Sequence, residues 1–331
     1  MNDINKNGVY VIGEIGQNHN GSTDIAKLIV ELVSRPIIQK EFGITLQPMN
    51  AVKLTKRDLK EELTDSQMNK IYDSPHSFGK TYGEHREFLE LNDEEHFEVY
   101  QFAKSRGLEF VETLCSKGCL SLLKLFTPDY LKVASRDLTN LPLLSAMAET
   151  KIPMILSTGM AGKKELDDAL HTISTYHNNI GILHCVSQYP THPDNVNLNT
   201  IAYLKKNYGQ YVIGFSDHTI GISAPVVAVG MGAKIIEKHI TIDRNMKGTD
   251  QAGSLGPDGV YRMLRDIRVT ERSLGIEDIY IEEGVISAKH KLERSIATNV
   301  SLKKGDVIKE EHLHLLSPGD GYKWSQKDEI I

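Results

Sequence analysis

The stretch YVIGFSDHTIGISAPVVAVGMGAKIIEKH, residues 211–239, decides the fold of this chain. Two short β-branched apolar runs, Tyr211-Val212-Ile213 and Ala233-Lys234-Ile235-Ile236, flank small residues that are typical of a helix. The pattern predicts two buried parallel strands joined by a crossover helix. A histidine follows each strand, His218 and His239, 21 residues apart. Because neighbouring strands lie roughly 4.8 Å apart, both imidazoles can reach one ion at the same end of the sheet.

A single histidine after a strand is more often a hydrogen-bonded core residue than a ligand. Here two histidines follow neighbouring strands, and an acid lies beside each, Asp217 and Glu237. We therefore interpret the pair as a metal or anion site. The pattern offers no third imidazole or thiolate, so carboxylate, water or substrate would complete the coordination. Such a set suits Mn²⁺ or Mg²⁺ as well as Zn²⁺ or Fe²⁺.

Composition argues against several classes of protein. The chain has 331 residues, 40% of them hydrophobic and 25% charged, which is typical of a soluble protein with a large core. Its formal charge is −6 and it has no basic stripe, which argues against nucleic-acid binding. We find no apolar run long enough to span a membrane and no signal-peptide pattern. Three cysteines, Cys115, Cys119 and Cys185, cannot form a disulfide framework, so we predict a cytoplasmic protein.

Strand-like apolar runs alternate with amphipathic helical runs through residues 1–275. Eight such repeats fit a TIM (β/α)8 barrel better than an open doubly wound sheet. A dinucleotide fold has little support, because no Gly-x-Gly-x-x-Gly follows the first strand. We predict a barrel over 1–275, a linker over 276–290 and a small β-rich module over 291–331, barely large enough to fold alone. The expected strands are 9–12, 51–54, 108–113, 130–135, 153–157, 181–185, 211–213 and 233–236.

Functional residues of a TIM barrel lie at the carboxyl ends of its strands. The residues predicted there are Glu14, Lys53, Lys132, Ser135, Asp137, Ser157, Ser187, Tyr189, Ser216, His218, His239 and, just beyond, Asp250. A lysine in an apolar strand is costly unless it meets a charge, so Lys53 and Lys132 predict a pocket for a small polyanion. Each serine would add a hydroxyl donor there, or would simply be a helix N-cap. The residues alone indicate a metal-assisted lyase or synthase acting on a phosphorylated small acid.

Six motifs, in this order along the chain, resemble those of the sialic acid synthase family, the N-acetylneuraminate synthases. They are EIGQNHNG (14–21), KVAS (132–135), LSTGM (156–160), HCVSQYP (184–190), GFSDHT (214–219) and EKHIT (237–241). The likeness spans most of residues 8–325. The segment GKTYGEH (79–85) is similar to a version of the long second loop that is also found in animal members using a phosphorylated hexosamine.

The resemblance implies a TIM barrel followed by an antifreeze-protein-like module, which caps the active site of the other subunit in a swapped homodimer. It implies a C–C bond-forming transferase that condenses phosphoenolpyruvate with an N-acyl-hexosamine. The acceptor would be N-acetylmannosamine or its 6-phosphate, and the product N-acetylneuraminate or its 9-phosphate, with release of phosphate.

The resemblance also assigns roles. The residues that would hold phosphoenolpyruvate are Lys53, Lys132, Ser135, Ser157, Ser187 and Ser216. Those that would contact the sugar acceptor or its reacting carbonyl are Glu14, Asp137, Tyr189 and Asp250. His218 and His239 would bind the divalent ion, commonly Mn²⁺ or Mg²⁺. Glu14 is our candidate for proton transfer or for steadying the cationic centre, the alternative being a structural carboxylate.

Four positions depart from the family pattern. Thr55 stands where many relatives have Gln, Asp137 where Glu is common, and Ser187 where Asn occurs in some members. Ser317 takes the place of an arginine that in relatives reaches the N-acyl group. These changes lie on the acceptor side, so the acceptor stays open. The chain also stops at Ile331 before such a module would normally be complete, which makes the module either shortened or truncated.

Three alternatives remain at this point. The same chemistry would also make legionaminic acid or another bacterial nonulosonate. A synthase of a seven- or eight-carbon sugar acid is less compatible with the histidine pair and the small C-terminal module. The non-enzymatic alternative is a barrel that binds a sugar phosphate without catalysis, and fold-level analogy alone does not exclude it.

Overall fold

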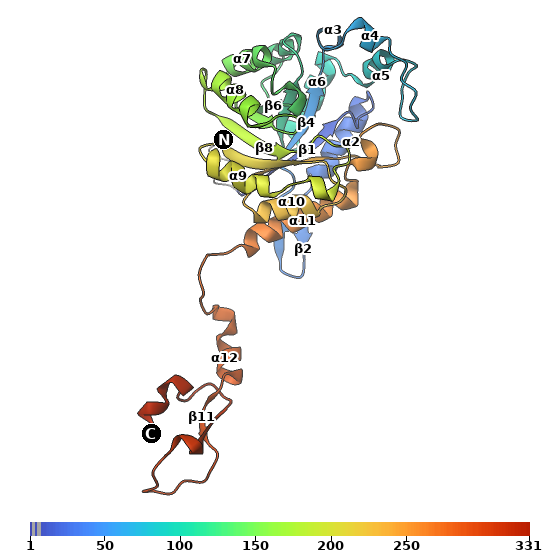
Figure 1. Cartoon of the computed structure of the whole chain (residues 1–331). Coiled ribbons are helices and arrows are strands. Elements are labelled where there is room, and N and C mark those ends of the chain that lie inside the picture. Colours follow the sequence, from blue (N-terminus) through green and yellow to red (C-terminus); the bar gives the residue numbers. More distant parts are fainter. Residues whose placement is uncertain (2–3, 5–7) are drawn as a thin grey trace. The chain divides into compact units, whose positions relative to one another are not determined.

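The computed structural model describes residue 1, residue 4 and residues 8–331. They form two compact units, Met1–Gly275 and Ile276–Ile331. The first unit is a closed barrel with strand order β1-β10-β9-β8-β7-β6-β5-β4, in which every pairing is parallel (Figure 1). The strands are β1 (Tyr10–Gly16), β4 (Ala51–Lys56), β5 (Glu109–Leu114), β6 (Tyr130–Val133), β7 (Met154–Ser157), β8 (Ile180–Cys185), β9 (Val212–Asp217) and β10 (Ile235–His239). The prediction of a TIM barrel is confirmed.

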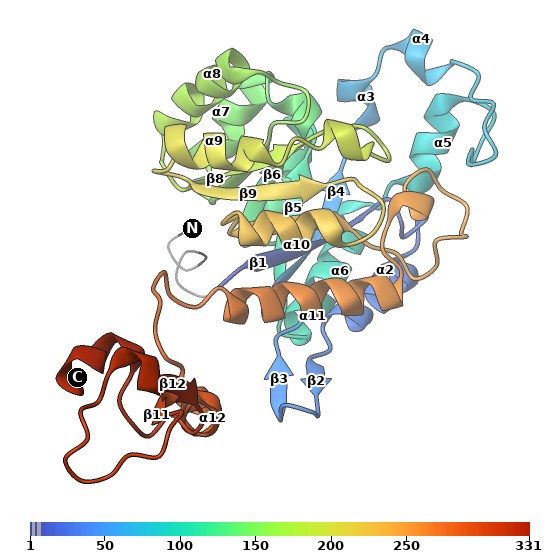
Figure 2. The same cartoon turned by 60° about the horizontal axis from the view of Figure 1, so that its bottom comes forward.

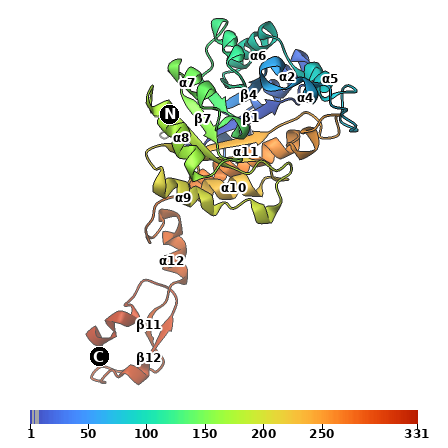
Figure 3. The same ribbon diagram turned by 45° about the horizontal axis from the view of Figure 1, so that its top comes forward.

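Amphipathic helices surround the barrel (Figures 2 and 3). They are α2 (Thr23–Val33), α6 (Asp93–Ser105), α7 (Leu141–Glu149), α8 (Lys163–Ser174), α9 (Asn199–Asn207), α10 (Ser223–Gly230) and α11 (Pro257–Ser273). Helix α2 shows the rule: the Ser22 side chain caps it, and Ala26, Ile29, Val30 and Val33 bury one face at the spacing of 3.6 residues per turn. Between β5 and β6 the connection is a 3₁₀-helix, η1 (Gly118–Lys124), in place of an α-helix.

Two insertions interrupt the regular repeat. Helix α2 ends at Val33, and a two-stranded hairpin follows, β2 (Ile37–Gln39) and β3 (Ile44–Leu46), labelled in Figure 2. The long polar segment after β4 carries three short helices, α3 (Leu59–Glu62), α4 (Asp65–Met68) and α5 (Tyr82–Leu89). This second insertion lies on the carboxyl side of β4, where a TIM barrel builds its site.

The barrel interior is layered, because side chains two residues apart on a strand point the same way. One layer is apolar and packs with Ile4: Tyr10, Ile12, Ala51, Val111, Tyr130, Ile155, Leu183, Val212 and Ile235. Towards the carboxyl ends of the strands, the layer above is polar: Glu14, Lys53, Thr113, Lys132, Ser157, Cys185, Ser216 and Glu237. All eight of these residues are buried. A second apolar core fills the space between the outer face of the strands and the helices.

The second unit, Ile276–Ile331, holds the helical segments η5 (Glu283–Val285), α12 (Ile286–Leu292), η6 (Glu310–His312) and η7 (Trp324–Glu329). Its strands β11 (Ser295–Thr298) and β12 (Leu313–Leu316) pair antiparallel. The helical turn at Glu283 begins inside the range expected to be linker, so only residues 276–282 there lack a helix or strand. Among the described residues of the chain, no helix combines the length and the apolarity needed to cross a bilayer.

Candidate functional site

A cavity of about 520 Å³ opens at the carboxyl ends of the barrel strands. All eight residues of the buried polar layer line it, together with residues of the loops that follow the strands. Of the twelve residues predicted from the sequence, eleven line this cavity: Glu14, Lys53, Lys132, Ser135, Ser157, Ser187, Tyr189, Ser216, His218, His239 and Asp250. A volume of this order accommodates two small substrates side by side.

Two lysines and two glutamates meet at the centre of the polar layer. Lys53 Nζ lies 2.5 Å from Glu14 Oε2 and 3.9 Å from Glu237 Oε2, and it donates to the Thr113 hydroxyl at 3.0 Å. Lys132 Nζ lies 3.8 Å from Glu237 Oε1 and donates to Ser157 Oγ at 2.6 Å. Neither Glu237 nor Thr113 is among the twelve site residues predicted from the sequence.

Burial and mutual attraction set the charges of this cluster. Burial lowers the pKa of Lys132, although Glu237 opposes the shift. Burial would also lower the pKa of Lys53, but the attraction of Glu14 and Glu237 wins and the pKa lies above its ordinary value. Burial raises the pKa of Glu14, whereas Lys132 and Lys53 bring the pKa of Glu237 down to about 2 against the effect of burial. The site therefore combines two buried lysines with a carboxyl, Glu14, that takes up a proton more readily than an exposed carboxyl does.

The predicted serines line the cavity rather than cap helices. Ser216 donates to Glu237 Oε1 at 2.9 Å, and Ser135 Oγ accepts from the Gly159 amide at 3.0 Å. Among the described helices, the N-caps of those following these strands are other residues, so the N-cap alternative is wrong for all four serines. Gly159 is required here, because a Cβ at this position would collide with Ser187 Oγ and lie 2.8 Å from Ser135 Oγ. The backbone of residue 159 therefore packs directly against the hydroxyls of Ser135 and Ser187.

The two histidines lie side by side in the wall of the cavity, at the ends of the neighbouring strands β9 and β10. Their ring centroids lie 5.3 Å apart, and the Tyr189 ring lies 4.1 Å from that of His218 and 5.9 Å from that of His239. His218 Nδ1 donates to the Val186 carbonyl at 3.0 Å, which leaves its Nε2 free to accept. His239 Nδ1 is buried without a hydrogen-bond partner, 3.9 Å from Asp250 Oδ2. Both rings thus line the cavity, and His218 is at the same time hydrogen-bonded to the backbone.

The donor set fits a divalent ion. Burial lowers the pKa of His239, which keeps its ring neutral and able to ligate. Among the described residues, no group of three or more His, Cys, Asp or Glu side chains converges as a ready-made metal cage. Within the part of the chain that the structure describes, His239 Nδ1 has no hydrogen-bond partner, and it lies 3.9 Å from Asp250 Oδ2. Two imidazoles beside a carboxylate suit an ion whose other ligands are oxygens of water or substrate.

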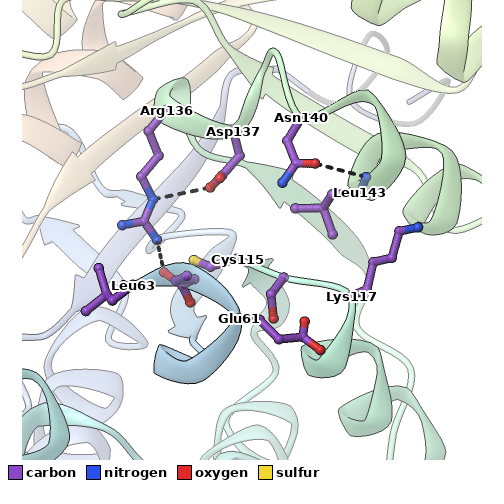
Figure 4. A pocket seen from close by; sticks show the side chains of 10 residues that line it. Glu61, Leu63, Cys115, Lys117, Arg136, Asp137, Asn140 and Leu143 are labelled. Carbon is purple, nitrogen blue, oxygen red and sulfur yellow. Dashed lines mark hydrogen bonds and ion pairs between the residues drawn. The ribbon is translucent and has the colours of Figure 1, made fainter. Parts of the chain in front are cut away.

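Asp137 is the exception among the predicted residues, since it lies in a neighbouring cavity (Figure 4). Its carboxylate accepts from Arg136 Nε at 3.3 Å, and Arg136 Nη2 donates to Glu62 Oε2 at 2.9 Å. Arg136 and Cys115 line both cavities. Asp137 therefore reaches the central cavity only through the orientation that it gives to Arg136.

Comparison with known proteins gives the family. The model of the NeuB family matches residues 46–278. The chain belongs to the NeuB family. It is 31% identical to the human N-acetylneuraminate-9-phosphate synthase over 299 residues, 90% of this chain and 80% of the relative. It is 34% identical to the N,N'-diacetyllegionaminic acid synthase of Legionella pneumophila over 330 residues, 97% of this chain and 89% of the relative.

Solved structures agree with this family. The crystal structure of N-acetylneuraminic acid synthetase from Leptospira borgpetersenii, in complex with citrate, superposes with a TM-score of 0.71 at 27% identity, covering 85% of this chain and 90% of that one. A 3-deoxy-D-arabino-heptulosonate 7-phosphate synthase from Thermotoga maritima has a TM-score of 0.58 at 13% identity, covering 82% and 89%, and shares the barrel fold. The resemblance to sialic acid synthases is confirmed for this NeuB family member.

Proposed function

We propose that this NeuB family protein is a C–C bond-forming transferase that condenses phosphoenolpyruvate with an N-acyl-hexosamine. The product would be a sialic acid, N-acetylneuraminate or its 9-phosphate, with release of inorganic phosphate. The observation that carries the proposal is the buried pair Lys53 and Lys132, held 3.9 and 3.8 Å from one carboxylate in a cavity that two neighbouring histidines also line. The similarity to the human and Legionella synthases supports it.

Phosphoenolpyruvate would lie against Lys53, Lys132, Ser135, Ser157, Ser187 and Ser216. Ammonium groups and hydroxyls in a buried site bind carboxylate and phosphate oxygens strongly, because water does not compete there. The close packing of Gly159 against Ser135 and Ser187 holds two of these hydroxyls in place at the cavity wall. Lys132 already donates to Ser157, so one rearrangement of hydrogen bonds would orient both toward the anion.

The divalent ion would be held by His218 and His239, with Mn²⁺ or Mg²⁺ as the expected metals. When bound, it supplies a Lewis acid next to the acceptor's aldehyde oxygen. The chain's own part is to hold both rings at the cavity. His218 is held by the Val186 carbonyl, and His239 Nδ1 is a buried atom 3.9 Å from Asp250 Oδ2.

The reaction forms a bond between the methylene carbon of phosphoenolpyruvate and the aldehyde carbon of the open-chain sugar, and the aldehyde oxygen takes up a proton. Water adds at the former enol carbon, and the tetrahedral intermediate loses phosphate by cleavage of its C–O bond. Glu14 is placed to transfer protons or to steady the cationic centre. Its pKa is raised by burial, and its Oε2 lies 2.5 Å from the Lys53 ammonium.

The sugar acceptor would contact Tyr189 and Asp250, which lie beside the histidines. Asp137 lines the neighbouring cavity, so we assign it at most the positioning of Arg136. A legionaminic acid synthase is the second candidate, favoured by the 34% identity to the Legionella enzyme. Following the resemblance, we also propose a cytoplasmic homodimer in which the unit Ile276–Ile331 caps the site of the other subunit.

The test is phosphoenolpyruvate-dependent phosphate release with purified protein and Mn²⁺ or Mg²⁺. Acceptors are N-acetylmannosamine, its 6-phosphate and a 2,4-diacetamido-hexose, and reactions lacking acceptor or containing EDTA are the controls. Turnover with one of the mannosamines supports the first candidate, and turnover with the diacetamido sugar alone supports the second. A protein that binds a sugar phosphate but releases no phosphate with any acceptor would be the non-catalytic barrel.

A further inference from the structure

One arginine of the cavity has a charge that nothing in the described residues balances. Five lysines and arginines line the cavity: Lys53, Lys132, Arg57, Arg86 and Arg136. Four of them have carboxylate partners within 4.0 Å. Arg86 has none among the residues that the structure describes. A half-buried cation in a binding cavity is expected to meet an anion, and here the protein does not supply it.

Neutral partners nevertheless hold Arg86 firmly. Its Nε donates to the Tyr82 hydroxyl at 2.8 Å and its Nη1 to Gln17 Oε1 at 2.6 Å, while the guanidinium carbon lies 5.0 Å from the centre of the Tyr82 ring. Guanidinium carries five N–H donors, so three remain, including both on Nη2. The group is thus oriented in advance, with a free edge for a ligand that accepts two hydrogen bonds.

The helix that carries Arg86 is fixed at its start. Thr81 and Glu84 form a capping box at the N-terminus of α5 (Tyr82–Leu89), with the Glu84 amide donating to Thr81 Oγ1 at 3.2 Å. A second cation lies nearby: Lys247 Nζ is 4.8 Å from the centre of the Phe78 ring and likewise has no carboxylate partner within the described ranges. Both cations lower the pKa of the buried His85, after the larger effect of its burial, and Asp250 raises it by a smaller amount. Two cations without a carboxylate partner among the described residues therefore act on the same site.

The charge of phosphoenolpyruvate does not explain Arg86. The two lysines of the polar layer come from β4 and β6, and they already form the positively charged end of the cavity. Arg86 comes instead from the inserted segment after β4, outside the barrel strands. Two separated cationic regions in one cavity indicate two anionic groups, one on each substrate.

We propose that Arg86 is a specificity-determining residue that binds an anionic terminus of the sugar acceptor, so that the substrate is the 6-phosphate of the N-acyl-hexosamine and the product is the 9-phosphate. This inference rests on the proposed function. A phosphate dianion offers three acceptor oxygens to the free guanidinium edge. A hexuronate carboxylate shares this chemistry but offers only two oxygens and one charge. We therefore commit to phosphate.

The experiment compares kcat/KM for N-acetylmannosamine 6-phosphate, N-acetylmannosamine and N-acetylmannosaminuronate at saturating phosphoenolpyruvate. Wild type is expected to prefer the 6-phosphate. Arg86→Gln should lower the ratio of kcat/KM for the 6-phosphate to kcat/KM for the neutral sugar about 100-fold. At 1.4 kcal/mol per tenfold change, this corresponds to about 2.8 kcal/mol. Arg86→Lys should recover part of the ratio, because it keeps the charge but loses the fork. Arg262→Gln is the matched control, an exposed arginine of α11 paired with Asp258, and should leave the ratio unchanged.

Three results would overturn the inference: equal use of the neutral sugar by wild type, preference for the uronate, or an equal loss on all acceptors in Arg86→Gln. The last result would mean that Arg86 only supports Gln17 and Tyr82. Wild-type turnover with the diacetamido sugar alone would also overturn it. If no acceptor supports turnover, the proposed function fails first. In that case, calorimetry with mannose 6-phosphate tests the anion site on its own. If Arg86→Gln binds this compound as tightly as wild type does, Arg86 is not an anion site either.

Discussion

Replacing Lys132 by methionine tests the centre of the proposed site. Lys132 is 2% exposed, and its ammonium donates to Ser157 Oγ at 2.6 Å and to the Val133 carbonyl at 3.0 Å. Methionine keeps a side chain of similar length without the charge and the three donors. In this variant Glu237 still has two partners, the Lys53 ammonium at 3.9 Å and the Ser216 hydroxyl at 2.9 Å. Its buried charge therefore stays compensated, and we expect the variant to fold.

The magnitude follows from the donors that are lost. A hydrogen bond to a charged group contributes about 1.5–3 kcal/mol, and two such bonds to phosphoenolpyruvate amount to about 4 kcal/mol. At 1.4 kcal/mol per tenfold change, kcat/KM for phosphoenolpyruvate should fall about 1000-fold. The assay is phosphate release at varied phosphoenolpyruvate, with circular dichroism to check the fold.

The matched control is Lys56→Met on the neighbouring side of the site. Lys56 lies on β4, three residues after Lys53, and bonds to the Leu91 carbonyl at 2.8 Å and to Asp93 at 2.9 Å, outside the central cavity. It should change stability but not the kinetics of phosphoenolpyruvate. Two results would refute the proposed binding of phosphoenolpyruvate by Lys132. Lys132→Met could keep kcat/KM within threefold of wild type, or Lys56→Met could lower kcat/KM by as much as Lys132→Met does.

Three further predictions use other parts of the molecule. His239→Asn should abolish Mn²⁺ binding in calorimetry while the unfolding temperature stays near wild type; unchanged binding would exclude the histidine pair. Gly159→Ala should raise the KM for phosphoenolpyruvate at least about tenfold, because the added methyl group collides with the Ser187 hydroxyl and displaces it from the proposed phosphoenolpyruvate site; a normal KM would place the ligand elsewhere. His19, 2% exposed, has its pKa lowered by burial to about 3. Only the unfolded chain therefore takes up a proton as the pH falls below about 6.5, and wild type should lose about 2 kcal/mol between pH 7 and pH 5, measured by urea unfolding. His19→Gln should flatten this dependence, and equal slopes in both proteins would contradict the assignment.

Much of the barrel was readable from the sequence, because each strand is a short β-branched run followed by polar residues. A role in the site could be predicted for Lys53 and Lys132, because a lysine among the apolar residues of a strand needs a charged partner. The structure supplies those partners as Glu14 and Glu237. Glu237 itself was overlooked, although its position two residues before His239 gave the signal, since residues two apart on a strand share a face.

Other features had no local signal. Arg86 lies in a long polar segment without periodicity, and only the packing of α5 brings it to Gln17 near the end of β1. Asp137 follows a strand as the active-site residues do, but the 3₁₀-helix η2 (Ser135–Asp137) turns its side chain toward Arg136 and the neighbouring cavity. The direction of a side chain after the last strand residue depends on loop geometry. The strand pattern does not encode it.

The pairing of Lys132 with Glu237 shows why the four central charges act as one unit. In the ring β1-β10-β9-β8-β7-β6-β5-β4, the strands β6 and β10 stand opposite each other, so this contact crosses the barrel axis. Glu237 also reaches Lys53, which lies on β4, two strands away in the ring. One carboxylate therefore holds apart and stabilises two ammonium groups that would otherwise repel each other in a buried site. Glu237 lies between Lys53 and Lys132 in the polar layer. The side of each ammonium group that faces the cavity therefore stays accessible. A substrate anion placed there meets both positive charges without having to displace the carboxylate that keeps them folded inside the barrel.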